Sequence, residues 1–395
     1  RNSTQKKVLE YLVLCGTPNA TSLNYFTFKN QLLQIVPSKN NPMYNSHIYW
    51  SQKSYNVCDY LIKSFSKEGD VIFDPFMGSG VTILEAIKKG MDRAAIGCDI
   101  NDLPLFISKT LLNINSIKSV EALITEFSAK ITPLISHYHT VCPYCGNTGI
   151  VTKVIFNKMQ RVGNDYNVTK IYYKCSNCKH TEKMPDRHDI DQMHSNEPLH
   201  YVKDIELLQN SKIAVCENDS IKNIFTERNL SVLDKILAII ETYNSTEKEI
   251  LQYILMSILH LCKITDTHSN SQWPLWIPKE NCVEKNVIEL LIKKLKSFMQ
   301  VKDFMKENYG FPNVAQNYST LKKNTCLLLK KGSQFIKEDE IPNNGVDLII
   351  TDPPYLDQVL YSEYLQLYSP FFNMDINFND EIVVSTAVGR NKDRE

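Results

Sequence analysis

The stretch Val71-Ile-Phe-Asp-Pro-Phe-Met-Gly-Ser-Gly-Val-Thr82 joins a short apolar run to an acidic residue and a glycine-rich loop. Far downstream, Leu348-Ile-Ile-Thr-Asp-Pro-Pro-Tyr355 is a second apolar run that stops at an aspartate and a loop. Such runs are typical of buried parallel strands, which deliver the residues that follow them to the carboxyl edge of a sheet. The two stretches therefore predict an α/β fold with a site at that edge.

The glycine-rich loop is suited to cradle a ligand. Gly78 and Gly80 lack a Cβ, so the backbone can turn sharply and a ligand can approach it closely. A second strand is expected from Arg93 to Ile100, and it contains Asp99 about 20 residues past the glycines, where a ribose would find a hydroxyl acceptor. The alternative is an ordinary strand-to-helix turn followed by a capping aspartate.

The loop Asp352-Pro-Pro-Tyr355 carries groups that suit an exocyclic amine. The two prolines fix φ and remove N–H donors, so the carbonyls around them are rigid acceptors. A carboxylate and a fixed carbonyl can accept both hydrogens of an amino group, and a tyrosine can stack on the base that bears it. Alone, the tetrapeptide could be a β-turn, but together with the glycine-rich loop it predicts a catalytic site.

The order DPFMGSG and then DPPY resembles the amino-methyltransferase family, which moves the methyl group of S-adenosylmethionine to N6 of adenine or N4 of cytosine in DNA. The resemblance covers roughly residues 40–110 and 325–395 and implies a Rossmann-like class I methyltransferase sheet. The residues that match the family's cofactor site are Asp74, Phe76, Gly78, Gly80 and Asp99, with a weaker match at Tyr49 and Lys53. The residues that match its catalytic loop are Asp352, Pro353, Pro354 and Tyr355.

The resemblance implies DNA as the partner, and aspartate rather than serine ahead of Pro-Pro-Tyr favours N6 of adenine over N4 of cytosine. It also makes a restriction or anti-phage protein a candidate partner. Two further functions stay open. One is an RNA base methyltransferase acting on tRNA or rRNA, and the other is a non-catalytic subunit that binds nucleic acid. Intact Gly78, Gly80, Asp99 and Asp352 argue against the non-catalytic subunit, which has no physical need for them.

Two CxxC pairs, Cys142-Pro-Tyr-Cys145 and Cys175-Ser-Asn-Cys178, offer four thiolates, the ligand set of a structural tetrahedral Zn²⁺ site. Strands are expected at Ile150–Phe156 and Val168–Tyr173, with a turn near Gly163, as in the hairpin of a zinc ribbon. A redox dithiol and an iron–sulfur cluster are the alternatives, and His180 could replace one thiolate. Four thiolates close the coordination shell, which predicts a scaffolding role rather than a catalytic one.

Composition limits the remaining classes of protein. Lys plus Arg equals Asp plus Glu at 44 each, so any contact with DNA must come from local patches. Residues 151–187 hold such a patch, with eight basic residues against three acidic ones, although a solvated hairpin face explains it equally well. Eleven cysteines including two CxxC pairs favour a reducing compartment, here the cytoplasm. The apolar segment Leu251–Ile264 is short of the roughly 18 residues of a membrane span.

The chain order predicts five parts: a helical segment and linker at 1–45, the cofactor half at 46–135, the zinc ribbon at 136–200, a helical insertion at 201–320, and the catalytic half at 321–395. Apolar spacing predicts helices at Tyr55–Phe65, Leu230–Tyr243, Glu247–Ile264 and Asn286–Phe304, and Thr226 is a candidate N-cap. In the family's order, target recognition lies in the insertion. Its stiff segment Trp273–Pro278 either lines a groove for a base or packs over two helices.

Four expectations concern the remaining segments. Helices are expected at Gln5–Leu14, Leu103–Ile135 and Tyr361–Phe372, and a strand at Glu381–Ser385. The family's sheet needs more strands after the catalytic loop than the last residues of this chain supply. Either the chain continues beyond residue 395, or another segment completes the sheet.

Overall fold

The structure is a computed structural model that describes residues 13–15, 25–38, 40–162, 165–267, 273–311, 313–354, 359–385, 387 and 390. The chain divides into two compact units, each with its own five-stranded sheet. The first unit holds the described residues of 1–118, 300–362 and 375–384. The second holds those of 119–299, 363–374 and 385–395.

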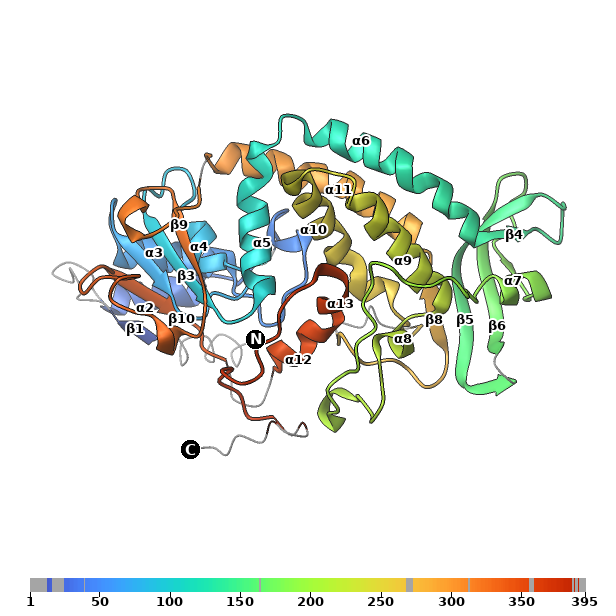
Figure 1. Cartoon of the computed structure of the whole chain (residues 1–395). Helices are drawn as coiled ribbons and strands as arrows, with labels where there is room; N and C mark the ends of the chain where they lie inside the picture. The colour runs from blue at the N-terminus through green and yellow to red at the C-terminus, as the bar shows by residue number, and fades with distance from the viewer. Residues whose placement is uncertain are drawn as a thin grey trace. The chain divides into compact units, whose positions relative to one another are not determined.

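In the first unit, the strands are β1 (Val13–Cys15), β2 (Val71–Asp74), β3 (Ala94–Asp99), β9 (Cys326–Lys330) and β10 (Leu348–Thr351), and the helices are α2 (Tyr25–Gln34), α3 (Tyr55–Phe65), α4 (Val81–Ala86) and α5 (Asp102–Asn113). The strands form one sheet in the order β1-β10-β2-β3-β9, and only β1 runs antiparallel to its neighbour. Figure 1 shows strands from the two ends of the chain, coloured blue and orange, in this one sheet. The predicted α/β class with a mostly parallel sheet is confirmed.

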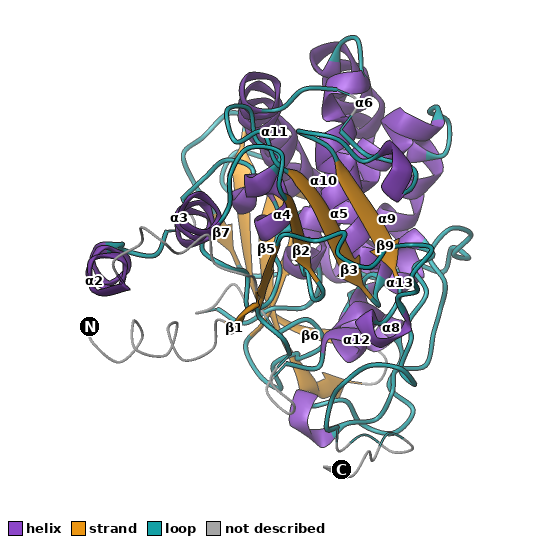
Figure 2. Cartoon of the chain, turned by 90° about the vertical axis from the view of Figure 1, so that its left-hand side faces the viewer, coloured by secondary structure: helices purple, strands orange, loops and turns teal. Residues whose placement is uncertain are grey.

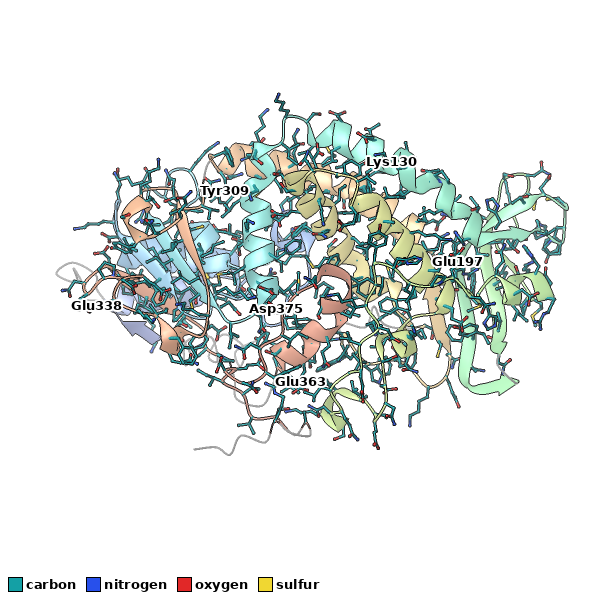
Figure 3. The ribbon with its side chains drawn as sticks, in the orientation of Figure 1. Lys130, Glu197, Tyr309, Glu338, Glu363 and Asp375 are labelled. Carbon is teal, nitrogen blue, oxygen red and sulfur yellow. The ribbon has the colours of Figure 1, made fainter. Side chains whose placement is uncertain are left out.

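Helix α4, which begins directly after the glycine-rich loop, is held tightly in the first unit. A Cβ on Gly97 of β3 would lie 1.8 Å from Cδ1 of Ile83, so α4 packs against the bare backbone of the strand. On α4 itself, the Leu84 carbonyl accepts a hydrogen bond from the Tyr309 hydroxyl at 3.2 Å. Tyr309 is labelled in Figure 3. These contacts fix the helix and thereby the loop that precedes it.

Two expectations at the margins of the sheet are wrong. Residues 13 and 14, the last two of the predicted helix Gln5–Leu14, belong to strand β1, and the rest of that prediction lies outside the described residues. The apolar Val-Leu-Cys segment pairs with the open edge of β10, so another segment does extend the sheet. Residues 381–385 form no strand. A side-chain contact holds them instead, since Glu381 accepts the Ser362 N–H at 3.0 Å.

Two expected helices are interrupted. The segment Leu103–Ile135 is divided between α5 and α6 (Val120–Ile131), because Ser119 accepts the Ala122 N–H at 3.1 Å and starts a new helix. The segment Tyr361–Phe372 breaks into α12 (Tyr361–Tyr364), a 3₁₀ turn and α13 (Ser369–Phe372). Pro370 has no N–H to donate, which prevents one continuous helix.

In the second unit, the strands are β4 (His139–Val141), β5 (Thr148–Val162), β6 (Asp165–Cys175), β7 (Glu182–Lys183) and β8 (Cys282–Lys285), and the helices are α6, α7 (Arg187–Asp191), α8 (Ile221–Ile224), α9 (Glu227–Ile240), α10 (Ser245–Cys262), most of α11 (Val287–Asn308), and α13. The strands are all antiparallel, and β5 with β6 forms the predicted hairpin. Strand β8 precedes α11 and pairs with β5, so the segment before the last long helix extends the ribbon's sheet (strands are orange in Figure 2).

A buried ion pair links α9 to β8. The Arg228 guanidinium donates to the Glu284 carboxylate from Nε at 3.1 Å and from Nη2, and both residues are buried. The Thr226 hydroxyl also donates to Glu284, at 2.7 Å. Thr226 is the N-cap of α9, as predicted, since its side chain accepts the Asn229 N–H. One buried carboxylate therefore joins the start of the helix to the sheet.

Candidate functional site

The candidate site lies where three parallel strands of the first unit end. Strand β2 ends at Asp74, β3 ends at Asp99, and Asp352 follows β10. The register pairs Ile72 with Leu348 and Asp74 with Gly97, so the three carboxyl ends lie at one edge of the sheet. From β2 the strand order runs outward to β3 and β9 on one side, and the chain then returns to place β10 on the other side of β2. In open α/β sheets, ligand crevices form at such a change of direction.

A cavity opens at this edge of the sheet, with about 820 Å³ of empty space that includes open solvent. The predicted residues in its wall are Tyr49, Lys53, Phe76, Gly78, Asp99, Asp352, Pro353 and Pro354. Two others, Asp74 and Gly80, are not in the wall. Tyr355 lies outside the described residues. The cavity thus brings together parts of the chain that the sequence separates by more than half of its length.

Asp99 holds the glycine-rich loop. One oxygen of its carboxylate accepts the Gly78 N–H and the other accepts the Asn101 N–H, both at 3.1 Å. Desolvation raises the pKa of Asp99 to about 7, and the two backbone hydrogen bonds offset only part of that effect. The carboxylate therefore changes its charge near neutral pH, at the position where a ribose would be held.

The resemblance assigns the ribose of S-adenosylmethionine to Asp99, so the raised pKa of this residue predicts a pH-dependent affinity for that cofactor. A protonated carboxyl has fewer acceptor lone pairs for ribose hydroxyls, so binding should weaken as pH falls below about 7. The affinity should drop by up to about tenfold per pH unit, measured by calorimetry between roughly pH 8 and 6. Asp99→Asn cannot titrate and should bind weakly at every pH. An equal slope in both proteins would assign the dependence to the ligand itself.

Lys53 and Asp74 stiffen the first turn of the loop. The Lys53 ammonium lies 3.3 Å from the buried Asp74 carboxylate and donates to the Phe76 carbonyl at 3.2 Å. Asp74 also accepts the Phe76 N–H at 3.1 Å. Burial lowers the pKa of Lys53, but the charges of Asp74 and Asp352 outweigh it and leave the pKa above its ordinary value. Lys53 is therefore a permanent cation that balances two carboxylates.

The Tyr49 ring packs against the backbone of the glycine-rich loop at Gly78. A Cβ on Gly78 would meet Cε1 of Tyr49 at 2.9 Å, so only a glycine leaves room for the ring. The Tyr49 ring also stacks on Tyr361, with centroids 5.8 Å apart and an interplanar angle of 21°. The segment around Tyr49 thus contacts the glycine-rich loop.

Gly80 is required for a different reason, which a substitution can test. Its φ is +80°, and an added Cβ would lie 2.3 Å from Oγ of Ser108. Gly80→Ala should destabilise the fold by about 1–2 kcal/mol for the left-handed backbone and roughly 1–3 kcal/mol more for the clash. Gly90→Ala is the matched control, since Gly90 has a φ of +83° and open space around it. Urea unfolding measures both, and equal losses would show that the contact with Ser108 is easily relieved.

Sequence reasoning missed the far wall of the cavity. The loop after β9 contributes residues 331–334, and residues 380–382 close the same wall. The Lys331 N–H donates to the Asp99 carbonyl at 3.0 Å, which holds the start of this loop beside the end of β3. Residues 381 and 382 belong to the segment that was expected to form a strand, so no sequence pattern indicated their place in the cavity wall.

The second unit holds a separate cluster of four thiols. The Sγ atoms of Cys142, Cys145, Cys175 and Cys178 all lie within 4.8 Å of one another. The closest pairs are 3.4 Å and 3.5 Å apart, near the roughly 3.8 Å edge of a tetrahedron with Zn–S bonds of about 2.3 Å. His180 is not in the cluster, because its ring stacks on Tyr144. Four sulfur donors at this spacing fit a tetrahedral metal ion such as Zn²⁺.

The family match covers the part of the candidate site that comes before residue 106 in the sequence. Residues 20–105 match the family model described as N6_N4_Mtase, DNA methylase. The resemblance to the DNA amino-methyltransferase family is thereby confirmed. A relative, the type II methyltransferase M.MjaII of Methanocaldococcus jannaschii, is 29% identical over 84 residues, 21% of this chain and 16% of that protein. The match to this relative thus spans a small part of both chains. No solved structure matches significantly.

None of the helices in the described part of the chain is both long and apolar enough to cross a membrane.

Proposed function

We propose that the chain is an S-adenosylmethionine-dependent DNA methyltransferase that acts on an exocyclic amino group, N6 of adenine. One observation carries the proposal: Asp352, Pro353 and Pro354 share a cavity wall with Gly78 and Asp99. The family match covers the stretch that holds the two cofactor residues but not the catalytic loop. The proposed fold is accordingly the Rossmann-like sheet of class I methyltransferases.

The wall of the cavity suits the proposed cofactor. The contact between Tyr49 and the backbone at Gly78 forms a cradle that any Cβ would fill. Asp99 uses its two oxygens to hold the loop, and a carboxylate has further lone pairs for ribose hydroxyls. S-adenosylmethionine, when bound, supplies an electrophilic methyl group. Tyr49, Lys53, Phe76, Gly78 and Asp99 would line its site, with Asp74 and Gly80 supporting them from behind.

In the proposed reaction, the chain orients an amino nitrogen. The Asp352 carboxylate and the Pro353 carbonyl accept its two hydrogens, which aims the nitrogen lone pair at the donor methyl. Tyr355 stacks on the base, which is swung out of the duplex. No strong base is needed: the new N–C bond would form as the S–C bond of the donor breaks to leave a neutral thioether, and the nitrogen, made acidic by its new bond, would release its proton to solvent. Cytosine, which also carries an amino group, is the alternative target, and the matched family includes both chemistries.

The second unit is proposed to recognise the target and to be stabilised by zinc. Its four thiols form a closed ligand set, so the ion would serve the scaffold. The ribbon hairpin carries basic and aromatic side chains together. Lys153 and Lys170 lie over the Tyr172 ring at 4.1 Å and 5.0 Å from its centroid, which suits contact with phosphates and bases. Salt bridges to acidic groups, such as that of Lys170 with Glu182, reduce this charge.

The deciding experiment supplies methyl-labelled S-adenosylmethionine with separate DNA and tRNA pools and identifies the product by nucleoside mass spectrometry. N6-methyladenine in DNA is the expected result. N4-methylcytosine would change the base and keep the enzyme class. A label in RNA alone would make the chain an RNA methyltransferase. If S-adenosylmethionine binds and no pool is labelled, even with restriction or anti-phage partner proteins added, the chain is a non-catalytic subunit.

A further inference from the structure

A second cavity lies wholly within the second unit, in a region that neither the catalytic loop nor the thiol cluster uses. Its empty volume is about 780 Å³. Three aromatic side chains, Trp273, Trp276 and Tyr364, contribute to its wall, and Lys212 and Asp266 add charge. Apart from Tyr364, these residues belong to the region for which the sequence predicts target recognition.

The aromatic wall offers a ring face to a ligand. Trp273 is 58% exposed, whereas Tyr364 is buried. The two rings stand nearly perpendicular, at 80°, with centroids 6.2 Å apart. A T-shaped pair of this kind helps to hold the indole in place, while more than half of the Trp273 side chain stays exposed. A large indole that is held in position and still exposed is suited to receive a flat partner.

Hydrogen bonds keep both sides of this cavity in place. The buried Lys263 amino group donates to the Trp276 carbonyl, and Pro274 and Leu275, which precede Trp276, are buried. On the opposite side, Asn210 donates to the buried Glu363 carboxylate at 2.6 Å, which ties the Lys212 turn to the helix of Tyr364.

The Glu363 anchor has further contacts. Its carboxylate also accepts the Arg390 guanidinium at 2.8 Å. Glu363 is labelled in Figure 3. The cavity is therefore built before any ligand arrives, so binding does not require these walls to be ordered first.

We propose that this cavity binds an unpaired nucleobase of the nucleic acid that the chain modifies. The inference rests on the proposed function and extends it to a second base. A base can stack on the Trp273 face, while Lys212 attracts the adjacent phosphate. Asp266 can accept a hydrogen bond from an exocyclic amino group. The cavity should therefore prefer adenine, cytosine or guanine over thymine, which has no amino group.

Tryptophan fluorescence can test this proposal, because the chain has three tryptophans and two of them line the cavity. In the Trp50→Phe variant, only these two indoles report. A single-stranded oligodeoxyadenylate should quench their emission in a saturable way, and an abasic strand of equal length should not. Oligothymidylate should bind more weakly than oligodeoxyadenylate, and Asp266→Ala should remove that difference.

A second measurement uses the anisotropy of a labelled strand. Trp273→Ala should weaken binding of oligodeoxyadenylate about tenfold, within the range for loss of one base–aromatic stack. Trp273→Phe retains a ring and should restore most of the affinity. If the alanine variant does not fold, the phenylalanine variant and the abasic strand still decide the question.

Two outcomes would overturn the inference. One is equal binding of the abasic and the intact strand, and the other is an unchanged affinity in Trp273→Ala. Quenching by tetramethylammonium but not by the oligonucleotide would instead assign the cavity to an organic cation. No S-adenosylmethionine is present in these assays. Base-dependent binding without methyl transfer would therefore refute the proposed function alone, and methyl transfer with unaltered binding in Trp273→Ala would refute the inference alone.

Discussion

Replacing Asp352 with alanine is expected to lower the rate of methyl transfer at least about 100-fold while S-adenosylmethionine still binds. The carboxylate is the charged acceptor at the end of β10, and it shares the cavity with the glycine-rich loop. Without it, one of the two amino hydrogens loses its acceptor, so the nitrogen lone pair is no longer aimed at the donor methyl. Single-turnover kinetics and calorimetry measure the two effects separately.

Two variants sharpen the Asp352 experiment. Asp352→Asn keeps the shape and one acceptor, so its rate should lie between those of the wild type and the alanine variant. Asp339→Ala removes an exposed carboxylate of the same unit that does not line the cavity, and its rate should be unchanged. Loss of S-adenosylmethionine binding in Asp352→Ala, with transfer reduced only in proportion, would contradict the assigned role and make Asp352 a cofactor residue.

Replacing Cys175 with serine is expected to remove the metal ion and to destabilise the second unit strongly. Cys175 is the last residue of β6, and its Sγ lies 3.5 Å from that of Cys145. The free energy that a structural zinc ion contributes to small metal domains is on the order of 10 kcal/mol. The wild type should contain one zinc ion per chain by elemental analysis, and the variant should contain none and should unfold at a lower temperature.

The matched control for the thiol cluster is Cys216→Ser. Cys216 is an exposed cysteine of the same unit outside the cluster, so its loss should change neither the zinc content nor the unfolding temperature. A strong chelator should reproduce the effect of Cys175→Ser in the wild type. Wild-type protein that contains no metal and resists the chelator would exclude the zinc site, and iron in place of zinc would revive the iron–sulfur alternative.

Local patterns predicted the elements that lie close to the site. Helix α3 has the predicted bounds Tyr55–Phe65, and β3 lies within the predicted strand that carries Asp99. These elements were readable because burial on one face sets the apolar spacing, and the glycine turn follows its strand directly in sequence. The hairpin of β5 and β6 could also be predicted, because its two strands are neighbours in the chain.

Predictions failed where a distant segment supplied the missing partner. A strand of three residues such as β1 has no period of its own, and only the open edge of β10 makes it a strand. Glu381 and Ile382 line the cavity although a strand was expected at Glu381–Ser385. Strand β8 likewise reads as part of a loop between two helices until its pairing with β5 is known.

The sequence by itself determined the α/β class, the two strand-end loops and the four-thiol ligand set, because each is written in short local motifs, the thiols as two CxxC pairs. Only the tertiary structure decided that Asp352 and Asp99 line one cavity, that Tyr49 covers Gly78, and that Trp273 and Tyr364 form a second pocket. These juxtapositions depend on the parallel register and on buried side-chain contacts between distant segments. No local spacing encodes them, since the energy that selects them arises only when the chain has folded.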